Sequence, residues 1–399
     1  MSDLGPYQVP GVYCSEVLEG LRQLPNDSVH CVVTSPPYWG LRDYGVEGQI
    51  GLEETWQEHL DVMIQVFEEV RRVLRSDGVA WVNYGDSYST KTWGRNPGSG
   101  RFGRKSERVA APKSQPNRMP QTGLKRGDLV GMPWRFALAL QEAGWWLRSD
   151  VIWHKPSVIP ESVKTRPTKS HEHLFLFAKS ARYFYDVDGF REPVSQESVR
   201  RYRRAAPRTD TQRDFPGPPR HYLETWSGVT VNGRQARDVW TIATEHRPEA
   251  HFATFPRALV ERCVRLGTSQ HGVCSECGAP WKRQVEVVDH AGVLGQDWRR
   301  RTDAPGYHDD LARGARGSAP SECAPQRTTV GWEPTCKCGG SEVEPAIVLD
   351  PFVGSGTTAV VAWSLGRDYL GFDLSEEYLA IARKRIGTEA RCQYELGVA

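Results

Sequence analysis

Short apolar runs alternate with helical patterns along much of this chain, and this alternation constrains the fold more than any other sequence feature. Val29–Val33 and Tyr369–Asp373 have the length and composition of buried strands. A helix is predicted after the capping box of Thr55 and Glu58, where apolar residues recur at helical spacing: Leu60, Ile64, Phe67, Val70 and Leu74. Because strands and helices in alternation favour a mainly parallel sheet, the sequence predicts an α/β fold.

The composition limits the number of domains and the class of protein. The 399 residues suffice for two or three domains, or for one large domain with insertions. No apolar run approaches membrane-spanning length, and Met1–Gly5 lacks the basic and apolar residues of a signal region. We therefore expect a cytoplasmic protein without a membrane partner. The net charge is only +2, so any nucleic-acid site must come from an uneven charge distribution.

The stretch Thr34–Trp39 is the first candidate site. It follows a predicted strand, at the edge where open α/β sheets bind ligands. Pro36 and Pro37 fix φ and remove two N–H donors, which leaves carbonyl groups without ladder partners. Ser35 Oγ and the Pro36 carbonyl can then accept both hydrogens of an exocyclic amine, while Tyr38 stacks on the ring of the base. The alternative is an ordinary turn that contains two prolines.

A second candidate site lies near the end of the sequence. The strand Ile347–Asp350 leads into a glycine-bearing turn that opens a helix, and the next strand ends in Asp373. Glycines let a ligand approach the backbone, and a terminal acid can bind ribose hydroxyls. Neither a P-loop lysine nor a third glycine follows, so a nucleoside-bearing ligand without phosphate fits better. The predicted binding residues are Glu16, Asp350, Phe352, Gly354, Ser355, Gly356, Thr357 and Asp373.

The nine cysteines include two closely spaced pairs, Cys274 with Cys277 and Cys336 with Cys338. In a reducing compartment, short paired spacings are more typical of a metal site than of disulfides. Four thiolates fit a tetrahedral structural zinc, whereas a catalytic zinc is not expected because no histidine or acid completes an open site. Free thiols are the alternative, and Cys323 could replace Cys338 as a ligand.

A basic segment, Lys91–Gly127, interrupts the regular pattern. It contains ten lysines and arginines against one acid, Glu107, a local balance of +9 in a nearly neutral protein. Such a segment cannot bury a core of its own. One interpretation is a solvated loop. The excess of positive charge favours the other, a segment that contacts nucleic-acid phosphates.

With both candidate sites in view, the chain resembles the DNA amino-methyltransferase family in its β-class, circularly permuted form. Thr34–Tyr38 is similar to the catalytic motif of that family, and Asp350–Thr358 to its S-adenosylmethionine motif. His251–Pro256 resembles the motif that precedes the cofactor strand. Glu16 falls where the family often has an acid preceded by glycine, whereas Ser15 precedes it here. The resemblance covers Gly11 to Asp86, Asp128 to Asp186, and His251 to the C-terminus.

The resemblance implies a mainly parallel seven-stranded sheet with helices on both faces and one antiparallel strand near His173–Lys179. It also implies that the strands of Asp350 and Asp373, although last in the sequence, lie beside the strands of Glu16 and Ser35. The expected division is a catalytic part at 1–185 with a basic mobile loop at about 89–127, a target-recognition region at 186–250, a cofactor-binding part of the same domain at 251–270 and 345–399, and a zinc-ribbon-like insertion at 271–344.

The implied activity is transfer of the methyl group of S-adenosylmethionine to the exocyclic amine of a flipped base in double-stranded DNA. N4 of cytosine is favoured, because the cytosine enzymes of the family mostly carry serine at the position of Ser35. The implied catalytic residues are Ser35, Pro36, Pro37 and Tyr38. N6 of adenine is the alternative, and an RNA or protein methyltransferase or a non-enzymatic zinc-bearing DNA-binding protein would be further ones. A prokaryotic or phage origin and a separate restriction endonuclease as partner would fit; no fused nuclease motif is recognisable, and the oligomeric state stays open.

Overall fold

The structure is a computed structural model. It describes residues 2–41, 45–89, 123–194, 197, 229–230, 233–245, 255–288, 326–340 and 342–395. The contacts divide the chain into two compact units. The first consists of Met1–Asp186, Asp238–Trp281 and Pro334–Ala399, and the second of Val187–Arg237 and Lys282–Glu333. The finer domain division expected from the sequence stays a prediction.

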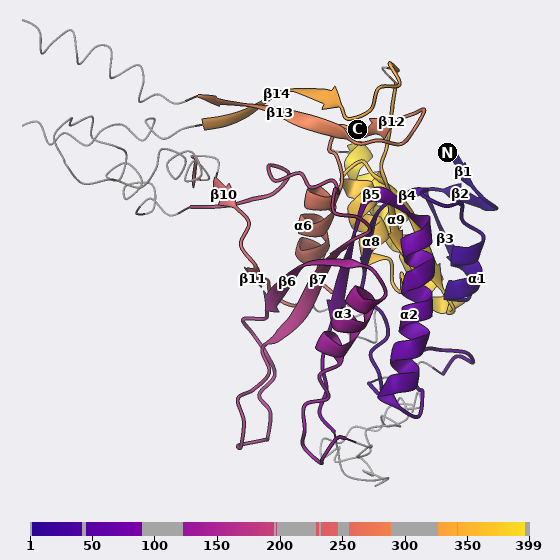
Figure 1. Ribbon diagram of the computed structural model, residues 1–399, viewed down its shortest axis with the longest axis vertical. Helices are drawn as coiled ribbons and strands as arrows, with labels where there is room; N and C mark the ends of the chain where they lie inside the picture. The colour runs from indigo at the N-terminus through magenta and orange to yellow at the C-terminus, as the bar shows by residue number, and fades with distance from the viewer. Residues whose placement is uncertain are drawn as a thin grey trace, which may run out of the picture. The chain divides into compact units, whose positions relative to one another are not determined.

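An eight-stranded sheet forms the centre of the first unit (Figure 1). Its strands, in spatial order, are β11 (Val239–Thr241), β6 (Trp146–His154), β7 (His171–Ala178), β5 (Leu74–Tyr84), β4 (Val29–Thr34), β16 (Ile347–Asp350), β17 (Asp368–Asp373) and β3 (Gly11–Cys14). Only β7 runs antiparallel to its neighbours, β5 and β6. The predicted α/β class and the antiparallel strand near His173–Lys179 are therefore confirmed.

The predicted number of seven strands is wrong, because β11 adds an eighth at the edge of the sheet. It pairs in parallel with β6, and the side chain of Trp240 is buried there. The Trp153 indole also donates to the Ile242 carbonyl at 2.9 Å, which fixes the end of this strand. Three residues of strand are too short to leave an alternating pattern in the sequence.

The prediction that the last strands of the sequence lie beside the first ones is confirmed. β16 and β17, the last strands of the chain, lie between β4 and β3, which come near its beginning. Val348 pairs with Cys31 of β4, and Phe372 pairs with Tyr13 of β3. The strands that end at Glu16, Ser35, Asp350 and Asp373 are therefore consecutive, and their carboxyl ends share one edge of the sheet.

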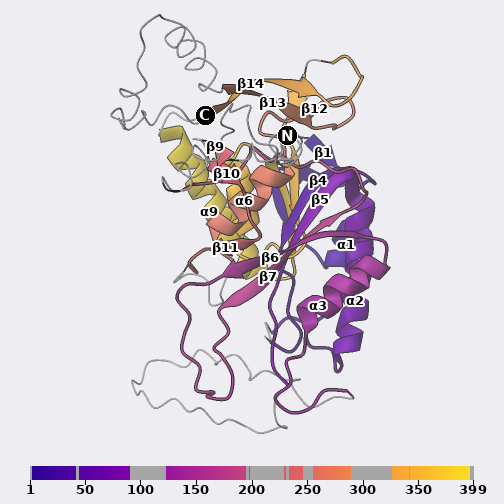
Figure 2. The ribbon, with the colours of Figure 1, turned by 60° about the vertical axis from the view of Figure 1, so that its left-hand side comes forward.

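Helices cover both faces of the sheet (Figure 2). One layer contains α1 (Val17–Arg22), α2 (Trp56–Val73) and α3 (Met132–Glu142), and the other contains α6 (Arg257–Gly267), α8 (Thr357–Ser364) and α9 (Glu376–Glu395). The predicted capping box begins α2: the Glu58 N–H donates to Thr55 Oγ1 at 3.1 Å, and the Thr55 N–H donates to Glu58 Oε2 at 3.0 Å. No helix in the described part of the chain is both long and apolar enough to cross a membrane.

The main core lies between the sheet and the first helix layer. Phe67 of α2 and Phe136 of α3 meet edge to face at 5.1 Å, and both are fully buried with Phe177 of β7. The core thus fixes the strands whose ends carry the candidate site. Two small ribbons flank this sheet: β1 (Ser2–Leu4) with β2 (Tyr7–Val9), and β12 (Val273–Cys274) with β15 (Val343–Glu344).

The second unit joins the predicted recognition region to the predicted insertion. It contains a three-stranded sheet of β8 (Arg191–Glu192), β9 (Val229–Thr230) and β10 (Gly233–Gln235), and most of a ribbon of β13 (Trp281–Val288) and β14 (Gln326–Pro334). The Arg327 guanidinium donates to both carboxylate oxygens of Asp188, at 3.0 and 2.9 Å. This paired contact links segments that are far apart in the sequence.

Candidate functional site

A cavity of about 290 Å³ opens at the carboxyl ends of β3, β4, β16 and β17. Both candidate sites from the sequence line this one cavity. The predicted residues among its walls are Glu16, Ser35, Pro36, Pro37, Tyr38, Phe352, Gly354, Ser355, Thr357 and Asp373. Segments from opposite ends of the sequence therefore supply a single site.

Ser35 belongs to a hydrogen-bonded cluster on one side of the cavity. Its hydroxyl lies 3.2 Å from the Tyr38 hydroxyl and 3.4 Å from Asn83 Oδ1. The Tyr38 hydroxyl also lies 3.2 Å from Asn83 Oδ1 and 3.2 Å from Glu172 Oε2. Burial, and then the Glu172 carboxylate, hold the pKa of Tyr38 well above its usual value. Tyr38 is therefore a neutral hydroxyl at neutral pH.

The ring of Tyr38 is fixed by its neighbours. It stacks on the buried ring of Tyr84, with centroids 5.1 Å apart and planes 23° from parallel. A Cβ atom on Gly85 would lie 2.6 Å from Tyr38 Cε2, so the glycine makes room for the ring. The aromatic wall of the cavity is thus held rigidly at the turn that begins with Ser35.

Three polar residues on this side of the cavity were given no role in the site from the sequence: Asn83, Lys155 and Glu172. Asn83 lies near the end of β5, beside β4, and Lys155 follows β6 directly. Glu172 is at the start of β7, but β7 is antiparallel, so its beginning lies at the edge where the parallel strands end. Combining the expected antiparallel strand with the position of Glu172 would have placed this acid in the site.

Asp373 and Glu16 lie on the other side of the cavity, at the ends of neighbouring strands. Asp373 Oδ2 accepts the Gly354 N–H at 2.9 Å, and Oδ1 accepts the Ser375 N–H at 2.8 Å. Burial raises the pKa of Asp373. Glu16 is the N-cap of α1, where its Oε2 accepts the Glu19 N–H at 2.9 Å. Each of these oxygens has a further lone pair for a hydroxyl or amine of a ligand.

Asp350 and Gly356 support the cavity from behind and are not among its walls. Asp350 is 1% exposed, and its Oδ1 accepts the Thr34 hydroxyl at 2.6 Å and the Phe352 N–H at 3.1 Å. Gly356 has φ 81°, and a Cβ there would lie 2.7 Å from Ala382 Cβ. Both residues shape the turn between β16 and α8.

The other carboxylate oxygen of Asp350 is in contact with Thr358. The Thr358 hydroxyl lies 2.7 Å from Asp350 Oδ2 and 3.1 Å from the Val33 carbonyl, but it has a single hydrogen. A protonated Asp350 can donate to Thr358, which then donates to Val33, so every group is satisfied. Burial raises the pKa of Asp350 to about 6, so this protonated arrangement is favoured only below that pH.

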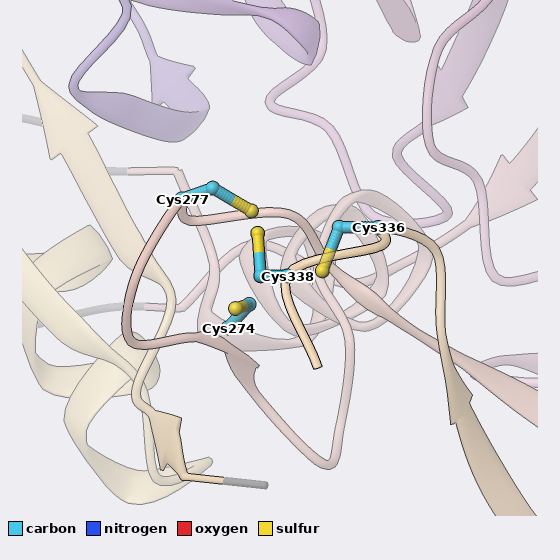
Figure 3. Close-up of side chains that lie close together, drawn as sticks. All are labelled: Cys274, Cys277, Cys336 and Cys338. Atoms are coloured by element: carbon cyan, nitrogen blue, oxygen red, sulfur yellow. The ribbon is translucent and has the colours of Figure 1, made fainter. Parts of the chain in front are cut away.

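The four predicted zinc ligands form a cluster of their own (Figure 3). The sulfur atoms of Cys274, Cys277, Cys336 and Cys338 all lie within 4.8 Å of one another. A tetrahedral zinc with Zn–S bonds of about 2.3 Å separates its sulfurs by roughly 3.8 Å, so the cluster can hold this ion after small movements. Cys323, the alternative ligand, lies outside the described residues, as do His251–Thr254 and most of the basic segment.

The loop of Cys274 and Cys277 is fastened to the central sheet. Arg75 of β5 donates to the Cys277 carbonyl at 2.7 Å. His30 of β4 accepts the Ile347 N–H on Nδ1 at 3.0 Å, so its Nε2 carries the hydrogen that is donated to the Gly278 carbonyl at 3.1 Å. Burial, and then Arg75, lower the pKa of His30 to about 4. The neutral ring therefore bridges the cysteine loop and two strands.

A mainly parallel sheet with a carboxylate-bearing cavity at the carboxyl ends of its strands is typical of enzymes that bind a nucleoside-bearing cofactor. The family model described as "DNA methylase", for N6 and N4 enzymes, matches residues 29–275 and 341–384. The chain belongs to this family of S-adenosylmethionine-dependent DNA amino-methyltransferases. The interior that the match omits, residues 276–340, contains β13, β14 and three of the four clustered cysteines.

Curated relatives match almost the whole chain. The type II methyltransferase M.XycI of Xanthomonas campestris pv. cyanopsidis is 34% identical over 373 residues, which are 93% of this chain and 85% of the relative. The type II methyltransferase M.SmaI of Serratia marcescens is 33% identical over 377 residues, 94% of this chain and 90% of the relative. The type II methyltransferase M.Cfr9I of Citrobacter freundii is 34% identical over 376 residues, 94% of this chain and 86% of the relative.

Proposed function

We propose that this enzyme methylates N4 of a cytosine flipped out of double-stranded DNA, as the modification enzyme of a type II restriction system. The observation that carries the choice of cytosine is the serine at position 35, which lines the cavity beside Pro36. Cytosine enzymes of the family mostly carry serine before the Pro-Pro-Tyr sequence. The type II relatives support the modification role and a separate partner endonuclease.

The proposed role of Ser35 and Pro36 is to change the shape of the target amine. An aromatic amine is a poor nucleophile because its lone pair is delocalised into the ring. When Ser35 Oγ and the Pro36 carbonyl accept its two hydrogens, a tetrahedral nitrogen with a free lone pair is favoured. Hydrogen bonds made most strongly in the transition state raise the rate of the chemical step. Tyr38, held by Tyr84, stacks on the flipped base, and Pro37 stiffens the turn.

The proposed cofactor half of the cavity consists of Glu16, Phe352, the turn Gly354–Thr357, and Asp373. S-adenosylmethionine supplies an electrophilic methyl group on sulfur when it is bound. Asp373 binds the ribose hydroxyls with the lone pairs that Gly354 and Ser375 leave available. Phe352 contributes an apolar wall, and Glu16 contributes an acceptor. Their position across the same cavity from Ser35 favours the in-line geometry that methyl transfer needs.

DNA recognition is assigned to two segments. The basic segment Lys91–Gly127 contacts phosphates, since ten cationic side chains oppose one acid. The region 186–250 reads the target sequence, and the described contact between Asp188 and Arg327 supports a shared unit with the insertion.

The four clustered cysteines hold a structural zinc in this proposal. Cys274 and Cys277 precede the ribbon of β13 and β14, and Cys336 and Cys338 follow it, so the metal closes the base of the insertion. Four thiolates leave no open coordination position, which fits a structural role. The ties of this loop to Arg75 and His30 connect the metal site to the sheet.

The product distinguishes the two target bases. DNA modified by the enzyme is digested to nucleosides, which are separated and weighed by mass spectrometry. N4-methylcytosine is expected. N6-methyladenine alone would reject cytosine and support the alternative, because adenine also presents two amine hydrogens to Ser35 and Pro36. The mechanism would stand in either case, since it depends only on the amine.

A further inference from the structure

We propose that Lys155 is the residue that selects cytosine: its ammonium group donates to ring atoms N3 and O2 of the flipped base, and Glu172 and Trp153 hold it in place. This inference rests on the proposed function and deepens it, because it names the group that reads the target base. Ser35 and Pro36 accept from an amine and cannot by themselves distinguish cytosine from adenine.

Lys155 is placed in the cavity by two contacts. Its Nζ forms an ion pair with Glu172 Oε1, and both side chains are 19% exposed. The same nitrogen lies 4.3 Å from the ring centroid of Trp153, in a cation–π contact. Lys155, Glu172 and Trp153 all line the cavity that contains Ser35. An ammonium group has three N–H donors, and Glu172 accounts for one of them.

A short chain of hydrogen bonds connects this cation to the amine-accepting turn. Glu172 Oε2 accepts from the Tyr38 hydroxyl at 3.2 Å, and Tyr38 in turn lies 3.2 Å from Ser35 Oγ. Glu172 therefore binds Lys155 with one carboxylate oxygen and the Tyr38 hydroxyl with the other. Along this wall the site offers acceptors at Ser35 and then a cationic donor at Lys155.

This order of hydrogen-bonding groups, acceptors first and then a donor, is complementary to the pairing edge of cytosine. Cytosine presents a donor at N4 followed by acceptors at N3 and O2. Adenine presents a donor at N6 and an acceptor at N1, but then a C–H group at C2. A partly buried donor that faces a C–H group loses its hydrogen bond, which disfavours the wrong base. Flipped bases are commonly read in this way along their pairing edge.

The carboxylate of Glu172 stabilises the partly buried charge of Lys155. A partly buried ammonium group without a partner would be costly, and the carboxylate offsets that cost. Because Trp153 and Lys155 are at the end of β6 and Glu172 is at the start of β7, paired strands fix the position of the cation. Glu172 and Trp153 are positioning residues in this account, and Lys155 is the group that contacts the base.

The test compares target bases in otherwise identical DNA. The recognition sequence is first read from DNA methylated by the wild-type enzyme. Duplexes then carry cytosine, 3-deazacytosine or adenine at the target position, and single-turnover rates are measured. The wild-type enzyme should lose about 10-fold or more with 3-deazacytosine, the loss of one charged hydrogen bond. Lys155→Met should methylate cytosine and 3-deazacytosine at similar rates, and its preference for cytosine over adenine should fall by a similar factor.

Three further variants separate base reading from folding. Lys155→Arg should keep the discrimination, because it keeps the cationic donor. The double variant Lys155→Met/Glu172→Gln removes both charges, so a loss of discrimination there cannot come from an unpaired carboxylate. Lys169→Met is the matched control: this lysine lies in the same loop but donates to the Asp86 carbonyl at 2.7 Å and does not line the cavity. It should discriminate as the wild-type enzyme does.

The outcomes that overturn the inference are distinct from failure of the proposed function. Undiminished discrimination by Lys155→Met would overturn it. Weaker S-adenosylmethionine binding by Lys155→Met with unchanged discrimination would also overturn it, because the cation would then serve the cofactor carboxylate. If the wild-type product is N6-methyladenine, the proposed function itself fails, and this is seen before any variant is made.

Discussion

The backbone N–H of Gly354 donates to Oδ2 of Asp373 at 2.9 Å, so the turn that follows β16 is fastened to the end of β17. The other carboxylate oxygen of Asp373 accepts from the Ser375 N–H, which fixes the short loop just before α9. One side chain thereby sets the distance between two walls of the proposed cofactor half of the cavity. A change at Asp373 should therefore affect binding more than catalysis.

Asp373→Ala should weaken S-adenosylmethionine binding by roughly 10- to 150-fold, because a charged hydrogen bond contributes about 1.5–3 kcal/mol. Isothermal calorimetry measures this directly. Asp368→Ala is the control, since Asp368 begins the same strand at the opposite edge and does not line the cavity. Unchanged affinity in Asp373→Ala would place the ribose elsewhere.

Ser35→Ala should reduce turnover by about 10-fold while leaving cofactor affinity nearly unchanged, because one hydrogen bond to the amine is lost chiefly in the transition state. Rates under saturating cofactor, together with calorimetry, separate the two effects. Ser28→Ala, near the other end of β4, removes a hydroxyl that donates to the Pro25 carbonyl and should leave turnover unchanged. A Ser35→Ala enzyme with full turnover would contradict the proposed role.

Asp350→Asn should change how stability depends on pH. The pKa of Asp350 is raised from 3.8 to about 6, so the neutral carboxyl is favoured by folding. Its contribution to stability is complete below pH 4 and is lost as the pH rises through about 6. Relative to Asp350→Asn, the wild-type free energy of unfolding should therefore fall by up to about 3 kcal/mol over this window. Urea denaturation at several pH values measures the difference, and parallel curves would show that Asp350 does not titrate there.

Metal-replete protein should contain one zinc per chain, and Cys336→Ser should lose most of it. Loss of the metal should expose the insertion to proteases while S-adenosylmethionine binding persists, because the cysteine cluster does not line the cofactor cavity. Elemental analysis, limited proteolysis and calorimetry give the three readouts. Cys14→Ser, an exposed cysteine outside the cluster, is the control for zinc content. Wild-type protein without zinc would reject the site.

Replacing Lys91–Gly127 by a short neutral linker should weaken DNA binding and flatten its dependence on salt, because fewer counterions are released from the phosphates. Fluorescence anisotropy at several salt concentrations measures the slope. The ten positive charges of the segment set the upper limit of the change. Glu107→Gln alone should leave the slope nearly unchanged. The same salt slope after the replacement would make the segment a solvated loop.

The sequence predicted those parts of the site that short motifs carry. Ser35, Gly354 and Asp373 each lie at or just after the end of an apolar run, and local pattern is enough to place them at one edge of a parallel sheet. Asp350 shows the limit of this reasoning, because the pattern puts it at the strand end but does not give the direction of its side chain. Its carboxyl turns inward to Thr34 and Thr358.

The parts that the local sequence pattern did not reveal depend on the long-range pairing of strands. Glu172 reaches the site because β7 runs antiparallel, and Lys155 is held by that acid. The predicted helix was expected to include Leu74, but α2 ends at Val73 and β5 begins at Leu74 without a loop. Leu74 pairs with Val29 of β4, so a tertiary contact overrides local helix propensity there.

The position of β16 and β17 between β4 and β3 has a consequence for folding during synthesis on the ribosome. Thr34 and Asp350, 316 residues apart, are joined by one hydrogen bond behind the site. Until the last strands have emerged, β4 lacks its neighbour β16, β3 lacks its neighbour β17, and the cavity lacks the walls supplied by Phe352, Gly354 and Asp373. Contacts of such sequence separation form slowly. We therefore expect that a chain lacking β16 and β17 does not bind S-adenosylmethionine.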